Sequence, residues 1–204
     1  MMIKIIVPSS LKIPASIATT FLAGAFLIAA LTTTNAAVIF NQEFQFFDVS
    51  GKDTLELFKD IKKKSPLKDK KRNEGKAAAA AIKIIPNADY TIIDSRCHIK
   101  TITITVDVVI HQPRWLNYSE ANSKSKVWWD NFIHDTKVHE LKHAAIAKKH
   151  ATLMQKKMMK HRSRSSCDKL EASLTGLVIK LLKNHDKAQL KFDKKEAGRI
   201  FRTR

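Results

Sequence analysis

The chain has 204 residues, 44% of them hydrophobic, and a formal net charge of +18. Its length suits one domain that can bury a hydrophobic core, and the positive charge favours anionic partners without indicating a chemistry. Aromatic residues are scarce in the basic clusters at 59–76, 148–164 and 180–204, whereas a face that binds single-stranded nucleic acid interleaves them with basic residues. We therefore expect no specific nucleic-acid partner.

The first residues have the organisation of a secretory signal peptide. Two lysines precede an apolar stretch at residues 13–31, and small residues follow at 32–37. We predict cleavage after Ala36 or Ala37, so that the mature protein begins near Val38 and is periplasmic or secreted. A membrane anchor is the competing interpretation, but a proline and several threonines interrupt the apolar stretch and no basic stop follows it.

Removal of residues 1–37 leaves a single domain at 38–204 with 35 basic and 19 acidic residues, and hence a net charge of +16. Such a charge suits attachment to an anionic envelope surface. Cys97 and Cys167 are the only two cysteines, and because an exported protein meets an oxidising environment, we predict that they form a disulfide. By closing about 70 residues of chain, the disulfide would stabilise the fold by about 4 kcal/mol.

The first half of the mature chain favours strands. Residues 38–49 are rich in aromatic and branched side chains and predict a first strand. Asp53 or Thr54 can cap a short helix at 55–63. The segment 62–76 combines a proline, a glycine and many charges, and we expect it to be an exposed loop, the least ordered part of the mature chain.

Residues 90–111 carry the clearest strand pattern. Apolar side chains at Ile102, Ile104 and Val106 alternate with threonines, which predicts one buried and one hydroxyl-bearing face. A break at Asp94-Ser95 predicts a hairpin or a bulge. We expect Pro113 to end the strand region.

The second half of the chain is helical. A first helix is predicted from Ser119 or Ser123 to about Lys160, and a second, antiparallel to it, at 168–195. The first helix has a stripe at three- and four-residue spacing: Trp128, Phe132, Thr136, His139, His143, Ile146, His150 and Leu153. The second has Leu170, Leu174, Leu177, Val178, Leu181 and Leu182. Together these elements predict an α+β fold, a small antiparallel sheet packed on the long helix and its antiparallel partner.

An HExxH motif lies in the first helix. The four-residue spacing places the imidazoles of His139 and His143 on one helix face, and Glu140 can address a water on a metal that they share. This pattern is typical of zinc hydrolases, so we expect Zn²⁺ as cofactor.

The motif does not identify the third metal ligand. His150 lies about 16 Å further along the same helix axis. No glycine follows His143 to turn the chain back, so a metzincin site is excluded. Because the second helix is predicted to run back along the first, its end should lie level with the motif. The candidates there are His185 and Asp193, followed by Glu196.

Several of these features together resemble an uncharacterised bacterial domain family described as predicted secreted zinc-dependent proteases. They are the segment Tyr90–Cys97, Pro113-Arg114-Trp115, Trp128-Trp129, the HExxH motif, Cys167 and Phe192-Asp193, and the likeness spans about residues 38–196. The resemblance implies a zincin-like metallopeptidase domain that acts on peptides or proteins. The family pattern continues after its aromatic-Asp pair with threonine and a His-Gly pair, but this chain lacks that histidine, so a third ligand has to come from the candidates above.

The expected mechanism is peptide hydrolysis by a metal-activated water, with Glu140 as general base. Candidate stabilisers of the oxyanion are Tyr90, Tyr118, His134 and His98. Asp135 could bind the ring N–H of His139. Two other interpretations stay open: a non-catalytic, basic periplasmic protein that binds the envelope and has a degenerate site, and a protein whose metal is structural.

Overall fold

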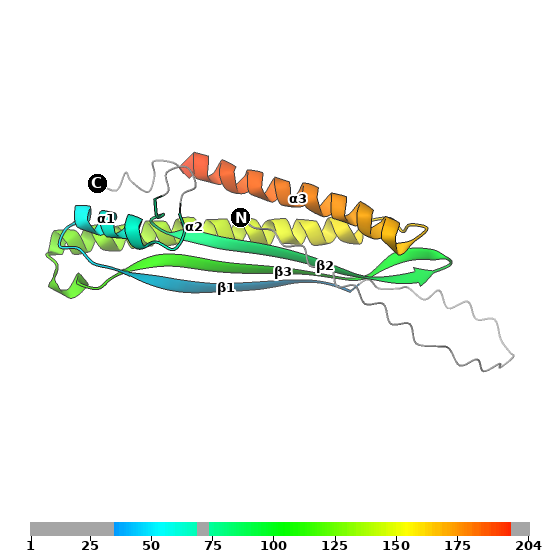
Figure 1. Cartoon of the computed structure of the whole chain (residues 1–204), viewed down its shortest axis with the longest axis horizontal. Helices are drawn as coiled ribbons and strands as arrows, with labels where there is room; N and C mark the ends of the chain where they lie inside the picture. The colour runs from blue at the N-terminus through cyan, green and yellow to red at the C-terminus, as the bar shows by residue number, and fades with distance from the viewer. Residues whose placement is uncertain (1–34, 69–73, 197–204) are drawn as a thin grey trace, which may run out of the picture.

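The computed structural model describes residues 35–68 and 74–196, which form an α+β fold with three strands and three α-helices (Figure 1). In chain order these are β1 (Asn35–Val49), α1 (Thr54–Lys64), β2 (Ala79–Ile93), β3 (Arg96–Trp115), α2 (Ser123–Met159) and α3 (Cys167–Glu196), with a 3-10 turn at Tyr118–Glu120 before α2. The predicted α+β class is confirmed. Most of the predicted signal peptide lies outside the described residues. Within them, no helix has both the length and the apolar character needed to cross a membrane.

The sheet has the order β1-β3-β2, with β3 in the centre. The β2–β3 pair is an antiparallel hairpin, as the sequence predicts, but β1 runs parallel to β3, so the sheet is mixed and not wholly antiparallel. The chain leaves β1 through α1 and returns to the other side of β3, which sets the direction of β1. Apolar alternation is the same in both directions, and for this reason the sequence pattern could not distinguish them.

The predicted two-faced pattern of β3 is confirmed. Ile102, Ile104 and Val106 are at most 1% exposed, whereas the threonines between them are half-buried. Figure 1 shows the helices gathered on one side of the strands. Three alanines of α2 at 144, 147 and 151 join the same core, and their small side chains let this helix approach the sheet closely.

The hairpin turns at Asp94-Ser95, both of which have positive φ values (47° and 58°). Two such residues form a type I′ turn, which fits the twist of the paired strands. β2 begins at Ala79, well before the predicted start at Tyr90. The first part of this strand contains alanines and Pro86, which are not typical of strands, so the sequence pattern did not indicate it. Pro86 is tolerated because β2 is at the edge of the sheet.

The prediction that Pro113 ends the strand region is wrong, because β3 continues to Trp115. Within the described residues, pairing with β2 stops where Ala79 meets His111. Pro113 therefore needs no hydrogen-bond donor on that side and pairs with Phe47 of β1 on the other.

α1 and the start of α2 enclose a second core. Asp53 caps α1, accepting hydrogen bonds from the N–H groups of Leu55 and Glu56 at 2.9 Å, as predicted. The helix ends at Lys64, so the predicted loop is shorter at its start, and residues 69–73 of that loop lie outside the described residues. The buried members of this core are Val49, Leu57, Ile61, Trp115, Trp129 and Phe132.

α2 has the predicted extent, and its cap is Asn122, which accepts from the N–H of Ser125. Its buried face differs in part from the predicted stripe: Leu153 is 42% exposed, while Met154 is fully buried. The helix contacts both the sheet and α3, so its buried surface is wider than one stripe. The buried side chains are Ser125, Trp129, Phe132, Thr136, His139, Glu140, Ala144, Ala147, Ala151, Met154 and Met158.

The predicted disulfide between Cys97 and Cys167 is present. It joins the hairpin end of β3 to the first residue of α3, and main-chain hydrogen bonds between Cys97 and Arg164 reinforce this junction. α3 then runs back along α2 (Figure 1), which brings its last turns level with the HExxH motif. The buried residues of α3 include Leu170, Leu174 and Val178, in agreement with its predicted stripe.

Candidate functional site

Three side chains converge where the end of α3 meets the middle of α2. Nε2 of His143 lies 3.1 Å from Nε2 of His139 and 2.8 Å from Oδ1 of Asp193, and the third side of this triangle is 3.3 Å. Ligand atoms of a tetrahedral zinc ion are separated by about 3.3–3.4 Å, given bonds of about 2.0–2.1 Å. The three atoms are therefore close enough together that they could hold one metal ion.

The ring of Phe192 on α3 packs against both histidines of this cluster. Its ring centroid lies 4.8 Å from that of His139 and 4.9 Å from that of His143. The side chains of the two histidines are only 11–12% exposed, whereas that of Asp193 is 47% exposed. The ring of Phe192 thus covers the two histidines, and the site is open to solvent beside Asp193.

The other candidate ligands do not belong to this group of three, although the charge of Glu196 acts on His139. His185 is 1% exposed and hydrogen-bonds to Gln189 and Asp186. Glu196 lies 3.9 Å from the ammonium group of Lys142. The ring of His150 packs against that of His185, consistent with its predicted exclusion from the metal. Of the three candidates, Asp193 is the one that joins His139 and His143.

Glu140 lies between the cluster and the edge strand. Its Oε2 accepts a hydrogen bond from the main-chain N–H of Ala80 on β2 at 2.7 Å. Burial raises the pKa of Glu140, although the charge of His143, this hydrogen bond and the charge of Lys76 oppose the shift. The Ala80 contact could not be predicted, because no local signal in the sequence marks which main-chain N–H of a distant strand meets the motif.

Gln189 is a second residue whose role sequence reasoning missed. Its Oε1 lies 2.6 Å from Nδ1 of His143, and its Nε2 lies 3.1 Å from the main-chain oxygen of the same residue and 2.8 Å from Nε2 of His185. Its position on the same helix face as His185 and Phe192 was the available signal. It links a candidate ligand to a buried histidine.

The remaining sequence candidates lie away from the cluster. Tyr118 hydrogen-bonds to Asp130 and packs on Trp115, and Tyr90 and His98 lie on the hairpin near Cys97. His134 is exposed. Asp135 does not bind the ring of His139, whose Nδ1 is buried and makes no hydrogen bond to the described residues.

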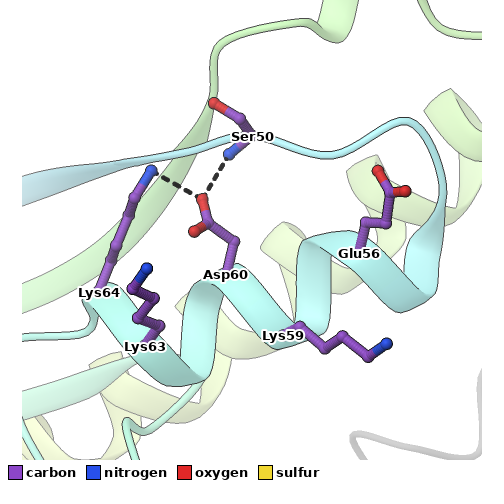
Figure 2. Close-up of a pocket in the computed structure, with 6 residues that line it drawn as sticks. All are labelled: Ser50, Glu56, Lys59, Asp60, Lys63 and Lys64. Atoms are coloured by element: carbon purple, nitrogen blue, oxygen red, sulfur yellow. Dashed lines mark hydrogen bonds and ion pairs between the residues drawn. The ribbon is translucent and has the colours of Figure 1, made fainter.

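A separate pocket of about 330 Å³ lies between α1 and the chain that follows β1 (Figure 2). In it, Oδ2 of Asp60 accepts from the N–H of Ser50 and pairs with Lys64, each at 2.8 Å. The lining residues are Ser50, Glu56, Lys59, Asp60, Lys63 and Lys64. Because these do not include the cluster residues, the pocket is not part of the candidate site.

Four buried or half-buried histidines favour their neutral forms. Burial lowers the pKa of His139, and His143 lowers it further, while Asp193 and Glu196 oppose the shift. Burial likewise lowers the pKa of His185, His150 and His161 below the ordinary value of 6.5. Neutral imidazoles are the form that binds metals.

We expect the metal-free protein to lose stability as the pH falls below about 6.5. The unfolded chain binds protons at these histidines at a higher pH than the folded chain does. The contribution to stability is therefore complete above the unfolded pKa and is lost as the pH falls through the lowered folded values. Urea unfolding with a chelator measures this slope, and His185→Gln should flatten it. An identical slope in the variant would contradict the expectation.

Comparison with known proteins identifies one family. The family model described as a bacterial protein of unknown function, DUF922, matches residues 44–199. No curated protein and no solved structure matches the chain. The matched range covers more than half of the 204 residues and contains the HExxH motif, both cysteines and Asp193. The chain therefore belongs to the bacterial family of unknown function DUF922.

Proposed function

We propose that this protein is an exported zinc-dependent peptidase in which His139, His143 and Asp193 hold the metal and Glu140 is the general base. The observation that carries the proposal is the triangle of three ligand atoms beside a buried carboxylate. Two imidazoles and one carboxylate, with a fourth position left open, are a ligand set found in catalytic zinc sites.

The chemistry of the donor atoms supports a cation at this position. Nδ1 of His143 faces the acceptor Oε1 of Gln189, so a neutral His143 keeps its one proton there. Its Nε2 then faces the carboxylate oxygen of Asp193 at 2.8 Å with lone pair opposite lone pair. A proton on Nε2 of His143 or a metal ion held by both atoms would remove this repulsion.

Zinc held by these residues would lower the pKa of water at the site and polarise the carbonyl of a substrate. Glu140 supplies the proton transfers. Because one of its oxygens is bound to the N–H of Ala80, the other is available to accept the proton of the water and to return it to the leaving amine. Burial strengthens Glu140 as a base by raising its pKa.

Export and peptide substrates are further parts of the proposal. The N-terminal pattern of a signal peptide supports export, as does a disulfide, which persists in oxidising compartments. The choice of peptides rests on the HExxH motif and on the resemblance to predicted secreted zinc-dependent proteases. Cleavage after Ala36 or Ala37 would remove the first residues of β1 and leave the rest of that strand intact.

Metal analysis tests the metal centre. We expect one zinc per mature chain, and we expect His139→Ala and Asp193→Ala to weaken zinc binding by more than about 100-fold, because each removes a ligand. His134→Ala, on an exposed position of the same helix, is the matched control and should bind zinc like the unchanged protein. Competition with a chromophoric chelator gives the affinities.

The same measurements separate the alternatives. A purified protein that stays metal-free with zinc supplied at neutral pH would contradict the proposal. If it also bound anionic vesicles in a salt-sensitive way, a non-catalytic envelope protein would replace the peptidase. A fourth protein ligand in the cobalt-substituted spectrum would indicate a structural metal. Within residues 35–68 and 74–196, the ligand cluster contains three side chains.

A further inference from the structure

A buried chain of polar groups leads from His143 into the interface between α2 and α3. Nδ1 of His143 contacts Oε1 of Gln189, Nε2 of Gln189 contacts Nε2 of His185, and Nδ1 of His185 lies 3.2 Å from Oδ1 of Asp186. Gln189 and His185 are one turn apart on α3. The chain ends at Asp186, whose side chain is 41% exposed.

One main-chain carbonyl fixes every proton in this chain. The oxygen of His143 can only accept, so the group of Gln189 that lies 3.1 Å from it must be the amide NH₂. The Gln189 carbonyl then faces Nδ1 of His143, which must carry a hydrogen. The second amide hydrogen points to Nε2 of His185, so the proton of His185 is on Nδ1, facing the carboxylate of Asp186.

We propose that Gln189, oriented by His185 and Asp186, is a positioning residue that holds His143 as an Nε2 ligand. The inference rests on the proposed metal centre, and it assigns His185 the role of an outer support and not of a ligand. The direction of the hydrogen bonds is the same throughout: each group donates toward Asp186, away from the metal. Through this chain, the carboxylate of Asp186 helps to keep the proton of His143 on Nδ1. The lone pair of His143 is then on Nε2, where it can bind the metal.

The location of these groups favours this role over simple packing. His185 is 1% exposed, where an unpaired ring nitrogen would be costly, yet both of its nitrogens have partners. Gln189 uses its carbonyl oxygen and both amide hydrogens. Outer partners of metal-binding histidines fix the tautomer and the ring orientation, and their loss lowers metal affinity about 10- to 100-fold.

Two substitutions at one position provide the test. Gln189→Met keeps the length of the side chain but removes all of its hydrogen bonds, and we expect it to weaken zinc binding at least tenfold. Gln189→Glu keeps an acceptor for Nδ1 of His143, and its zinc affinity should fall less than that of Gln189→Met. His150→Gln is the control, because His150 touches the ring of His185 without joining the chain of hydrogen bonds, and its zinc affinity should change less than twofold.

Nitrogen-15 NMR of the metal-free protein provides a readout that does not depend on zinc. We expect both His143 and His185 to carry their protons on Nδ1, and Gln189→Met to shift His143 toward the other tautomer. A neutral His143 that carries its proton on Nε2 and not on Nδ1 in the unchanged protein, or zinc binding by Gln189→Met equal to that of the unchanged protein, would overturn the inference. If the expected tautomers were found in a protein that binds no zinc, the proposed function would fail while the hydrogen-bond chain itself would stand.

Discussion

Glu140→Gln is expected to abolish peptide hydrolysis while leaving zinc bound. Glutamine has nearly the same shape as glutamate, and its carbonyl oxygen can still accept the hydrogen bond from Ala80. It cannot accept a proton from water, however. Removal of a general base lowers rates by about 10²–10⁴-fold, which would place the variant near the limit of detection. The measurement is cleavage of a quenched fluorescent peptide library by the zinc-loaded protein, with metal content determined on the same sample.

The buried position of Glu140 gives this experiment an internal control on folding. Its side chain is buried and its pKa is raised in the fold, so the ionised carboxylate is less stable there than in the unfolded chain at neutral pH. Glu140→Gln removes that buried charge, and the metal-free variant should be at least as stable as the unchanged protein. Inactivity would then reflect lost chemistry. A variant that kept zinc and the full cleavage rate would rule out Glu140 as the base.

Helical periodicity explains how much of the site the sequence could predict. His139, Glu140 and His143 are related by spacing within one helix, and an α-helix turns that spacing directly into geometry. Because α3 was expected to run antiparallel to α2, the candidates for the third ligand were limited to a few residues near position 189. Of these candidates, Asp193 lies beside the two histidines. The choice within that set depends on the rotation of α3 about its axis, which packing against α2 decides.

Contacts between distant elements account for what was missed. The N–H of Ala80 meets Glu140 only because β2 is the edge strand, and its early start was hidden by alanines that have no strand preference. The parallel direction of β1 likewise depends on the path through α1. The exposure of Leu153 shows the same limit on α2, because a helix that contacts two partners buries more than one stripe.

Loss of the disulfide is expected to have the largest effect on stability. Cys97 and Cys167 are 70 residues apart, and in the chain-entropy model a loop of this length contributes about 4 kcal/mol to the free energy of unfolding. Cys97→Ala together with Cys167→Ala removes the link without leaving buried thiols. Urea unfolding of this variant should match that of the reduced, unchanged protein. A loss below about 1 kcal/mol in both would show that the main-chain bridge between Cys97 and Arg164 suffices.

The disulfide and the proposed metal centre hold opposite ends of α3. Cys167 begins the helix and Asp193 lies about 39 Å along it, near its last turn. Zinc at about 1,000 times its Kd would stabilise the fold by about 4 kcal/mol, similar to the contribution of the disulfide. We therefore expect saturating zinc to restore most of the stability of the double alanine variant while its zinc affinity stays close to normal. A parallel loss of affinity would mean that the disulfide sets the register in which Asp193 meets His139 and His143.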